Sequence, residues 1–276
     1  MASERLQPKG WGRREVFIGL GLLLLFQALT TAAFGAIVVA KGADLRLSDR
    51  GDDVFDKANI ALDWGQDRAV AVANGEALPT PPHLYADLFA VKVGFSTTLV
   101  FEVMLVGLVA VMTRQTDLRA LIKTFGLDRF DFNGLWVPVV AVIGTYALTA
   151  AFIVTVQALG LDALTPRSNV PSEIVRDDLG LIMAGVLALI AAPLGEEFFF
   201  RGFMITGLLR WGAWPAIATS AMIFAIAHLS LGAIFPFFIA GCVMGWLYWR
   251  RGSLWDSMAF HFLFNATSYA LLLTTR

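Results

Sequence analysis

Two carboxylates and one guanidinium lie within six consecutive residues of an otherwise apolar part of the chain. Glu196, Glu197 and Arg201 follow the apolar run 179–194 and lead directly into another apolar run. An ionised side chain at the centre of a bilayer helix costs roughly 2.5–3.5 kcal/mol on insertion scales. Three charged groups at such a position are rarely retained for structure alone. We therefore predict a reaction centre inside a membrane.

The spacing of these three residues separates their roles. Glu197 and Arg201 are four residues apart, so on a helix they share a face and can neutralise each other as an ion pair. Glu196 lies about 100° around the helix from Glu197, where the same arginine cannot serve it equally well. Glu196 is therefore the better candidate for chemistry, and a carboxylate is a competent general base when it can reach the reacting proton.

Two of the three histidines in the chain lie in predicted membrane helices. His228 comes four residues after Phe224, and His261 comes four residues before Asn265. Each of these polar groups alone is explained by a hydrogen bond to a neighbouring helix. Together with Glu196, the two imidazoles supply what water activation requires, with or without a metal. His261 and Asn265 can both donate to a developing oxyanion, and we expect all these groups to face one shared cavity.

The composition of the chain is that of a membrane protein. Hydrophobic residues make up 57% and charged residues 16% of it, against about 25% charged residues in soluble domains. The net charge of −1 gives no indication of nucleic-acid binding. The single cysteine, Cys242, excludes an intramolecular disulfide and a cysteine-based metal cluster. We expect one all-α, polytopic, membrane-embedded domain.

Spanning helices need about 20 mainly apolar residues, and seven segments of the chain qualify. They are roughly Val16–Ala40, Leu88–Met112, Leu135–Leu159, Gly180–Leu208, Pro215–Leu229, Gly232–Trp249 and Leu254–Thr274. An eighth helix results if the fourth segment is two elements, split near Pro193 or Gly195. Gly241 and Gly245 form a small-xxx-small pair that is typical of helix packing.

Basic residues near the helix ends predict the orientation. They gather in the N-terminal tail, in the loop 113–134 and in the pair Arg250–Arg251. These positions alternate as expected for a cytoplasmic N-terminus and an outward C-terminus. The first apolar run of about 25 residues exceeds the roughly 7–15 of a signal peptide, so we interpret it as an anchor. We place the protein in a bacterial inner membrane.

Glu102 is the other acidic residue deep in a predicted helix. Two interpretations stay open for it: pairing with a neighbouring helix, or lining a water path to the cavity. Lys92, nearer the end of the same helix, is expected to extend its ammonium to the interface.

The order of the three motifs resembles the CPBP intramembrane protease family, which includes the CAAX prenyl endopeptidases and bacteriocin-processing proteins. The motifs are Glu-Glu-xxx-Arg, Phe-xxx-His and His-xxx-Asn, on successive late helices. The resemblance covers about residues 180–273. It divides the chain into two regions. Residues 1–178 comprise N-terminal helices and a large extramembrane loop and carry no motif. Residues 179–276 comprise the CPBP-like catalytic helices.

The resemblance implies an intramembrane endopeptidase that acts on a membrane-associated protein or peptide. It implies that Glu196 and His228 activate water, while His261 and Asn265 stabilise the oxyanion. Glu197 and Arg201 complete the motif set. An older interpretation of the family makes Glu196, His228 and His261 ligands of a divalent metal such as zinc, and both schemes remain open here.

Two other classes of function also use polar residues inside a membrane protein. A non-catalytic membrane scaffold of bacteriocin-immunity or regulatory type has no need for the full set of polar residues. A proton-coupled transporter also uses intramembrane Glu and His, but transporters usually show two related halves. Here the polar residues are concentrated in the C-terminal third of the chain.

Overall fold

The computed structural model describes residues 6, 10–41, 65–77, 79, 88–115, 117–161, 164–166, 174–175 and 177–274. These residues fold into helices joined by turns, and none of them forms a strand. The α-helices outside the long segment 178–211 are α1 (Arg13–Ala40), α3 (Leu88–Thr113), α4 (Leu118–Thr124), α5 (Trp136–Ala158), α9 (Ala213–Ala227), α10 (Ile234–Arg251) and α11 (Trp255–Leu273). Residues 65–74, in the predicted extramembrane loop, are also helical.

Four of the described helices are long and apolar enough to cross a membrane by length and composition. They are Arg13–Ala40, Leu88–Thr113, Phe132–Ala158 and Asp178–Trp211, and a shorter apolar helix covers Ala213–Ala227. Many large apolar side chains on α1, α3 and α5 are exposed, as contact with lipid requires. The predicted fold class, a polytopic helical membrane protein, is confirmed. Helices occupy all seven predicted segments, whereas the number of crossings stays a prediction.

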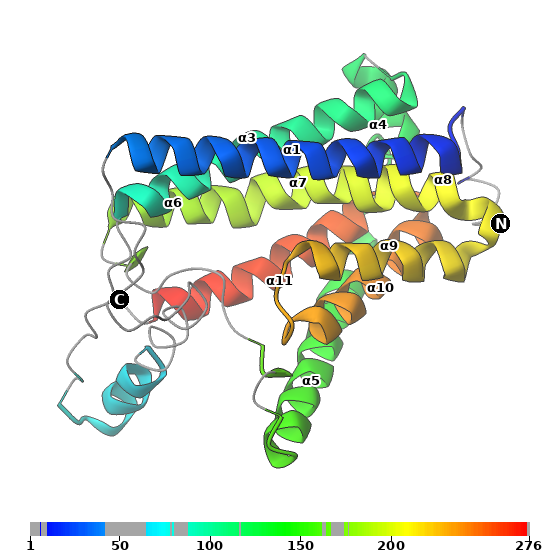
Figure 1. Cartoon of the computed structure of the whole chain (residues 1–276). Helices are drawn as coiled ribbons and strands as arrows, with labels where there is room; N and C mark the ends of the chain where they lie inside the picture. Colours follow the sequence, from blue (N-terminus) through cyan, green and yellow to red (C-terminus); the bar gives the residue numbers. More distant parts are fainter. Residues whose placement is uncertain are drawn as a thin grey trace.

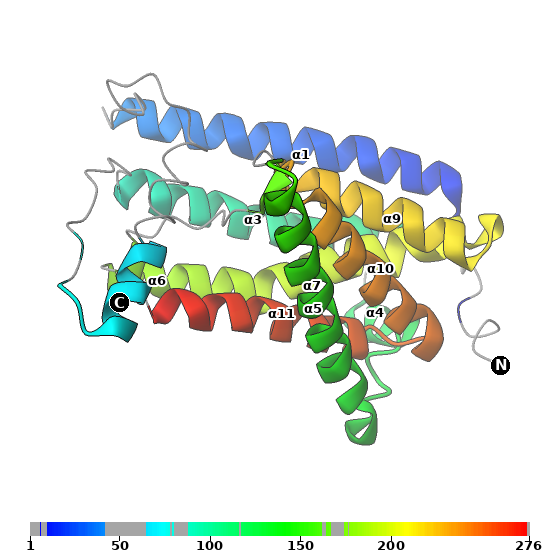
Figure 2. The same ribbon diagram turned by 90° about the horizontal axis from the view of Figure 1, so that it is seen from below.

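The helices form a bundle in which the long ones run side by side. Figure 1 shows α1, α3 and the segment that contains α6, α7 and α8 as roughly parallel rods. Helix α11 packs against that segment and against α5, which crosses the other helices steeply (Figure 2). Helices α9 and α10 form a hairpin. This places α3, α7, α9 and α11 around one region of the molecule.

The fourth predicted segment is one continuous helical stretch, 178–211, and it does not split at Pro193 or Gly195. It consists of α6 (Asp178–Val186), the π-helical η4 (Leu187–Ala191), α7 (Ala192–Glu196), the π-helical η5 (Glu197–Ile205), α8 (Thr206–Leu208) and the 3₁₀-helical η6 (Leu209–Trp211). Pro193 has no N–H and clashes with the carbonyl four residues earlier in a regular helix. The wider π-helical turn η4 ends two residues before Pro193, and the carbonyls that a regular helix would place against the proline ring lie in this turn. π-Helical turns are rare and frequent at functional sites.

Small residues allow α9 and α10 to approach closely. A Cβ atom added to Gly241 would lie 2.9 Å from Cα of Ala221, and one added to Gly245 would lie 2.9 Å from Cγ2 of Ile217. The predicted packing role of this glycine pair is confirmed.

One end of the bundle gathers three segments that are distant in sequence. The indole of Trp11, before α1, donates to the carbonyl of Phe203 at 3.0 Å and lies 6.1 Å from the ring of Phe125. The hydroxyl of Ser253, between α10 and α11, donates to the carbonyl of Gly126 at 2.7 Å. The N-terminal segment, the α4–α5 loop and the α10–α11 turn therefore share one end.

The beginnings of α3 and α6 meet at the other end of the bundle. Nζ of Lys92 lies 3.0 Å from Oδ1 of Asp177, the residue that caps α6 by accepting from the backbone N–H of Gly180. The hydrogen bond from Lys92, together with that from Gly180, lowers the pKa of Asp177 below its ordinary value. The Lys92 ammonium thus lies at a helix end, where it is neutralised by a neighbouring helix.

Candidate active site

The centre of the polar cluster is the carboxylate of Glu197, which is fully buried at the start of η5. Its Oε1 accepts from Nη1 of Arg201 at 2.9 Å and from Nδ1 of His261 at 3.0 Å. Its Oε2 accepts from the hydroxyl of Ser257. The ion pair expected from the i,i+4 spacing is present, and the same carboxylate also binds two side chains of α11. Glu197 therefore connects the two helices that carry most of the motif residues.

Arg201 is also fully buried, and its second neighbour is aromatic. The guanidinium carbon lies 4.3 Å from the centre of the Phe224 ring, a distance at which the face of the ring attracts a cation. Nε and Nη2 of Arg201 have no hydrogen-bond partner in the part of the chain that the structure describes. The Phe200 ring lies farther from the guanidinium carbon, at 5.9 Å, so the buried charge depends strongly on the one carboxylate that pairs with it.

His261 lies between the two glutamates. Since the Glu197 carboxylate can only accept, the Nδ1 atom of His261 carries the shared hydrogen. On the other side of the ring, Nε2 lies 3.7 Å from Oε2 of Glu196. This arrangement fixes the orientation of the imidazole and directs its second nitrogen toward Glu196.

Glu196 differs from Glu197 in having no fixed donor. Its side chain is 16% exposed, and its buried Oε2 has no hydrogen-bond partner among the described residues. No arginine in the described part of the chain forms an ion pair with it, and Arg201 pairs with Glu197 instead. Glu196 is thus the carboxylate of the pair that can accept a proton from another molecule.

His228 directly follows the last residue of α9 and caps that helix, and Phe224 links it to the rest of the cluster. Nδ1 of His228 donates to the carbonyl of Phe224 at 2.8 Å, which leaves Nε2 as the acceptor of the neutral ring. The Phe224 ring lies 4.7 Å from the His228 ring and 6.2 Å from the His261 ring, centre to centre. Between the described side chains of His228 and Glu196 there is no direct hydrogen bond.

Asn265 lies one turn beyond His261 on α11. Its Nδ2 donates to the carbonyl of Ala188, in the π-helical turn η4, at 2.7 Å. The structure therefore brings Glu196, Glu197, Arg201 and His261 into direct contact, joins His228 through Phe224, and places Asn265 on the next turn. Their catalytic roles stay predictions.

Ser257 belongs to the cluster although no motif singled it out. Its hydroxyl donates to Glu197 and it is fully buried. The spacing of Ser257, His261 and Asn265 is a run of i, i+4 and i+8 positions, which lie on one face of a helix. That spacing was the available signal, but serine is common in membrane helices and carries little information alone.

The residues that a zinc ion would need are not grouped for that purpose. Among the described residues, no set of three or more His, Cys, Asp or Glu side chains is arranged so that it could hold a metal ion. Nδ1 of His261 and Nδ1 of His228 bind Glu197 and a backbone carbonyl, so Nε2 of each ring is the nitrogen that a metal would use. As the described residues stand, Glu196, His228 and His261 are not gathered into a metal site, and no step below is routed through a metal.

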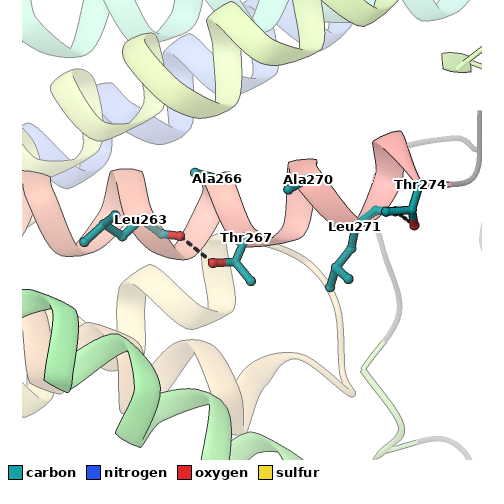
Figure 3. Close-up of a pocket in the computed structure, with 6 residues that line it drawn as sticks. All are labelled: Leu263, Ala266, Thr267, Ala270, Leu271 and Thr274. Atoms are coloured by element: carbon teal, nitrogen blue, oxygen red, sulfur yellow. Dashed lines mark hydrogen bonds between the residues drawn. The ribbon is translucent and has the colours of Figure 1, made fainter.

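A pocket of about 420 Å³ lies on α11 but not at this cluster. Figure 3 shows its lining residues along one stripe of the helix: Leu263, Ala266, Thr267, Ala270, Leu271 and Thr274. At about 100° per residue, this stripe is on the face opposite to His261 and Asn265. The cavity predicted for the polar residues therefore stays a prediction.

Comparison with known proteins identifies one family. The family model described as type II CAAX prenyl endopeptidase Rce1-like matches residues 178–267. The match covers about a third of the chain and includes all three motifs, so the resemblance to the CAAX-type intramembrane proteases is confirmed. It supports a membrane-embedded hydrolase of the CAAX endopeptidase type. Searches of the curated proteins and of the solved structures found no match.

Proposed function

We propose that the protein is an intramembrane endopeptidase in which Glu196 activates a water molecule for attack on a peptide bond. The observation that carries this proposal is the contrast between two adjacent glutamates. Glu197 is neutralised by Arg201 and bound by His261, whereas Glu196 has a buried carboxylate oxygen with no donor among the described residues. A general base must have such a free oxygen in reach of the proton it takes.

The proton transfers follow from the positions of these groups. Glu196 takes a proton from water while the water oxygen adds to the carbonyl carbon, and it returns a proton to the leaving amine nitrogen as the C–N bond breaks. The Nδ1 hydrogen of His228 is bound by the Phe224 carbonyl. His228 therefore helps to orient the water by accepting a hydrogen bond from it at Nε2. General acid–base catalysis of this kind contributes about 10²–10⁴-fold to the rate.

We assign stabilisation of the oxyanion to His261 and Asn265, on successive turns of α11. Glu197 accepts the Nδ1 hydrogen of His261 at 3.0 Å, so His261 donates to the oxyanion from Nε2 in its doubly protonated form. One amide hydrogen of Asn265 is bound by Ala188, which leaves the second hydrogen of the amide as a donor. Removing one preorganised donor of this kind typically costs about 10²–10³-fold in kcat.

The proposed substrate is a membrane-associated protein or peptide that reaches the site from the bilayer or the cytoplasm. The proposed location is a bacterial inner membrane, with the N-terminus in the cytoplasm. A non-catalytic scaffold is not favoured, because a scaffold would not need the buried polar residues that surround Glu196. The substrate sequence and any lipid modification are left open.

The test compares new peptide termini in membranes that contain the wild type or Glu196→Gln at equal levels. We expect termini that appear with the wild type and are reduced about 100-fold or more with the variant. Glu76→Gln, a change at an exposed glutamate outside the bundle, serves as the control and should match the wild type. Equal sets of termini from wild type and Glu196→Gln would show that Glu196 is not the base.

A further inference from the structure

Ser257 carries a buried hydroxyl group on α11 that the proposed mechanism does not use. The residue is fully buried, and its hydroxyl donates to Oε2 of Glu197, which belongs to a different helical segment. A serine inside a helix can instead donate to the carbonyl four residues earlier on its own helix, as Ser96 of α3 does at 2.8 Å. The hydroxyl of Ser257 therefore serves a tertiary contact.

The carboxylate of Glu197 divides its donors between its two oxygens. Oε1 accepts from Arg201 at 2.9 Å and from Nδ1 of His261 at 3.0 Å, whereas Oε2 accepts from Ser257. Among the described residues, no other side chain donates to Oε2. Loss of the Ser257 hydroxyl would thus leave a buried carboxylate oxygen without a partner, which is costly.

The hydrogen bond from Ser257 also limits how the Glu197 carboxylate can turn. The terminal torsion of a glutamate is broad, and rotation about it moves both oxygens. A donor on Oε2 opposes this rotation and so keeps Oε1 at Nδ1 of His261. Because Ser257 and His261 are one turn apart on α11, they share a face, and two successive turns of one helix bind the same carboxylate.

The consequence for the imidazole of His261 is found at its other ring nitrogen. Nε2 lies 3.7 Å from Oε2 of Glu196, on the side where the proposed reaction takes place. With Nδ1 bound by Glu197, the ring cannot turn without losing a buried hydrogen bond. Polar networks whose members are all paired make a site rigid.

We propose that Ser257 is a positioning residue that holds the His261 ring, through Glu197, with Nε2 directed toward the reacting carbonyl. Ser257 itself does not touch the substrate or the water. The oxyanion role of His261 rests on the proposed function, whereas the series of contacts from Ser257 through Glu197 to His261 does not. Alanine is a better helix former than serine, so the role belongs to the hydroxyl and not to the helix.

The first test observes the His261 ring directly, by nitrogen-15 NMR of the full-length protein in lipid with labelled histidine rings. The chain has three histidines, and the His261 signal is the one lost in His261→Asn. We expect the Nδ1 resonance of His261 to move in Ser257→Ala. It should stay in place in the control Ser96→Ala, at an exposed serine of α3. An unmoved resonance in Ser257→Ala would overturn the proposal.

A second variant keeps the proposal testable if Ser257→Ala does not fold. Ser257→Cys fills nearly the same space, and its thiol is a weaker donor than a hydroxyl. The Nδ1 resonance of His261 should therefore still move from its wild-type position. A wild-type resonance in the folded Ser257→Cys protein would overturn the proposal as well.

The kinetic test uses a substrate identified by its new termini and separates this proposal from the proposed function. Ser257→Ala should lower kcat about 10-fold with KM unchanged, because the lost hydrogen bond orients a group that acts in the transition state. Full kcat of Ser257→Ala beside an inactive Glu196→Gln would overturn the positioning role and leave the protease intact. An active Glu196→Gln would refute the proposed function, and the His261 resonance would then decide the proposal by itself.

Discussion

Adjacent glutamates in this site have different surroundings, and these surroundings decide what each can do. Glu197 accepts from Arg201, His261 and Ser257, which uses both of its oxygens. Glu196, one residue earlier, has an oxygen without a donor among the described residues. The first is therefore a structural carboxylate that orients His261. The second is the carboxylate that we propose for proton transfer.

At the scale of the residue, the buried ion pair gives a direct prediction. Arg201→Ala leaves the Glu197 charge without its cation, and breaking a buried pair in this way costs about 3–5 kcal/mol. We expect a much lower thermal unfolding temperature in detergent. Arg210→Ala, at an exposed position, is the matched control and should unfold like the wild type. Identical unfolding of both variants would mean that the pair contributes little.

At the scale of the element, the contact between α3 and α7 depends on Gly195. Gly195→Ala places a methyl group against the Glu102 backbone, and overpacking of this kind costs about 1–3 kcal/mol. We expect a lower unfolding temperature together with reduced proteolysis, since Glu196 follows directly.

The control for this substitution is on α3 itself. A Cβ atom at Gly107 would meet nothing within 4 Å, and alanine is the better helix former. Gly107→Ala should therefore be neutral or slightly stabilising. If the two alanine variants unfold at the same temperature, the close approach at Gly195 is not a constraint.

At the scale of the whole molecule, the contacts sort the helix ends into two groups. Trp11, Phe125 and Ser253 mark one end, and the pair of Lys92 with Asp177 marks the other. If the chain crosses the bilayer at each of the seven predicted segments, Trp11, Phe125 and Ser253 lie on one side of the membrane. Lys92 and Asp177 then lie on the opposite side. The grouping agrees with this alternation of sides, and a cytoplasmic N-terminus stays a prediction.

This orientation can be measured with single cysteines in a Cys242→Ala background. Asp128 lies in the α4–α5 loop and Leu231 in the α9–α10 turn, and both are exposed. With a cytoplasmic N-terminus, a membrane-impermeant maleimide should label Leu231→Cys in intact cells. It should label Asp128→Cys only after the cells are opened. The reverse pattern would invert the proposed topology.

The sequence alone determined the features that depend on neighbouring residues. Long apolar runs predicted the helices, because a bilayer requires about 20 such residues per span. The i,i+4 spacing predicted the Glu197–Arg201 pair, since one helix fixes both side chains. The order of the motifs predicted the family that matches residues 178–267. The suggested split of the fourth segment was wrong, because a π-helical turn accommodates Pro193.

Only the tertiary structure decided which faces of these helices meet. The hydrogen bonds from His261 and Ser257 to Glu197 join residues about 60 positions apart. The contact of Glu102 with Gly195 spans an even longer separation. A membrane helix that is apolar on all sides gives no hydrophobic stripe from which its rotation can be derived. Its rotation is set by packing against neighbours, which here placed Ser257 beside Glu197 and Glu102 against the backbone at Gly195.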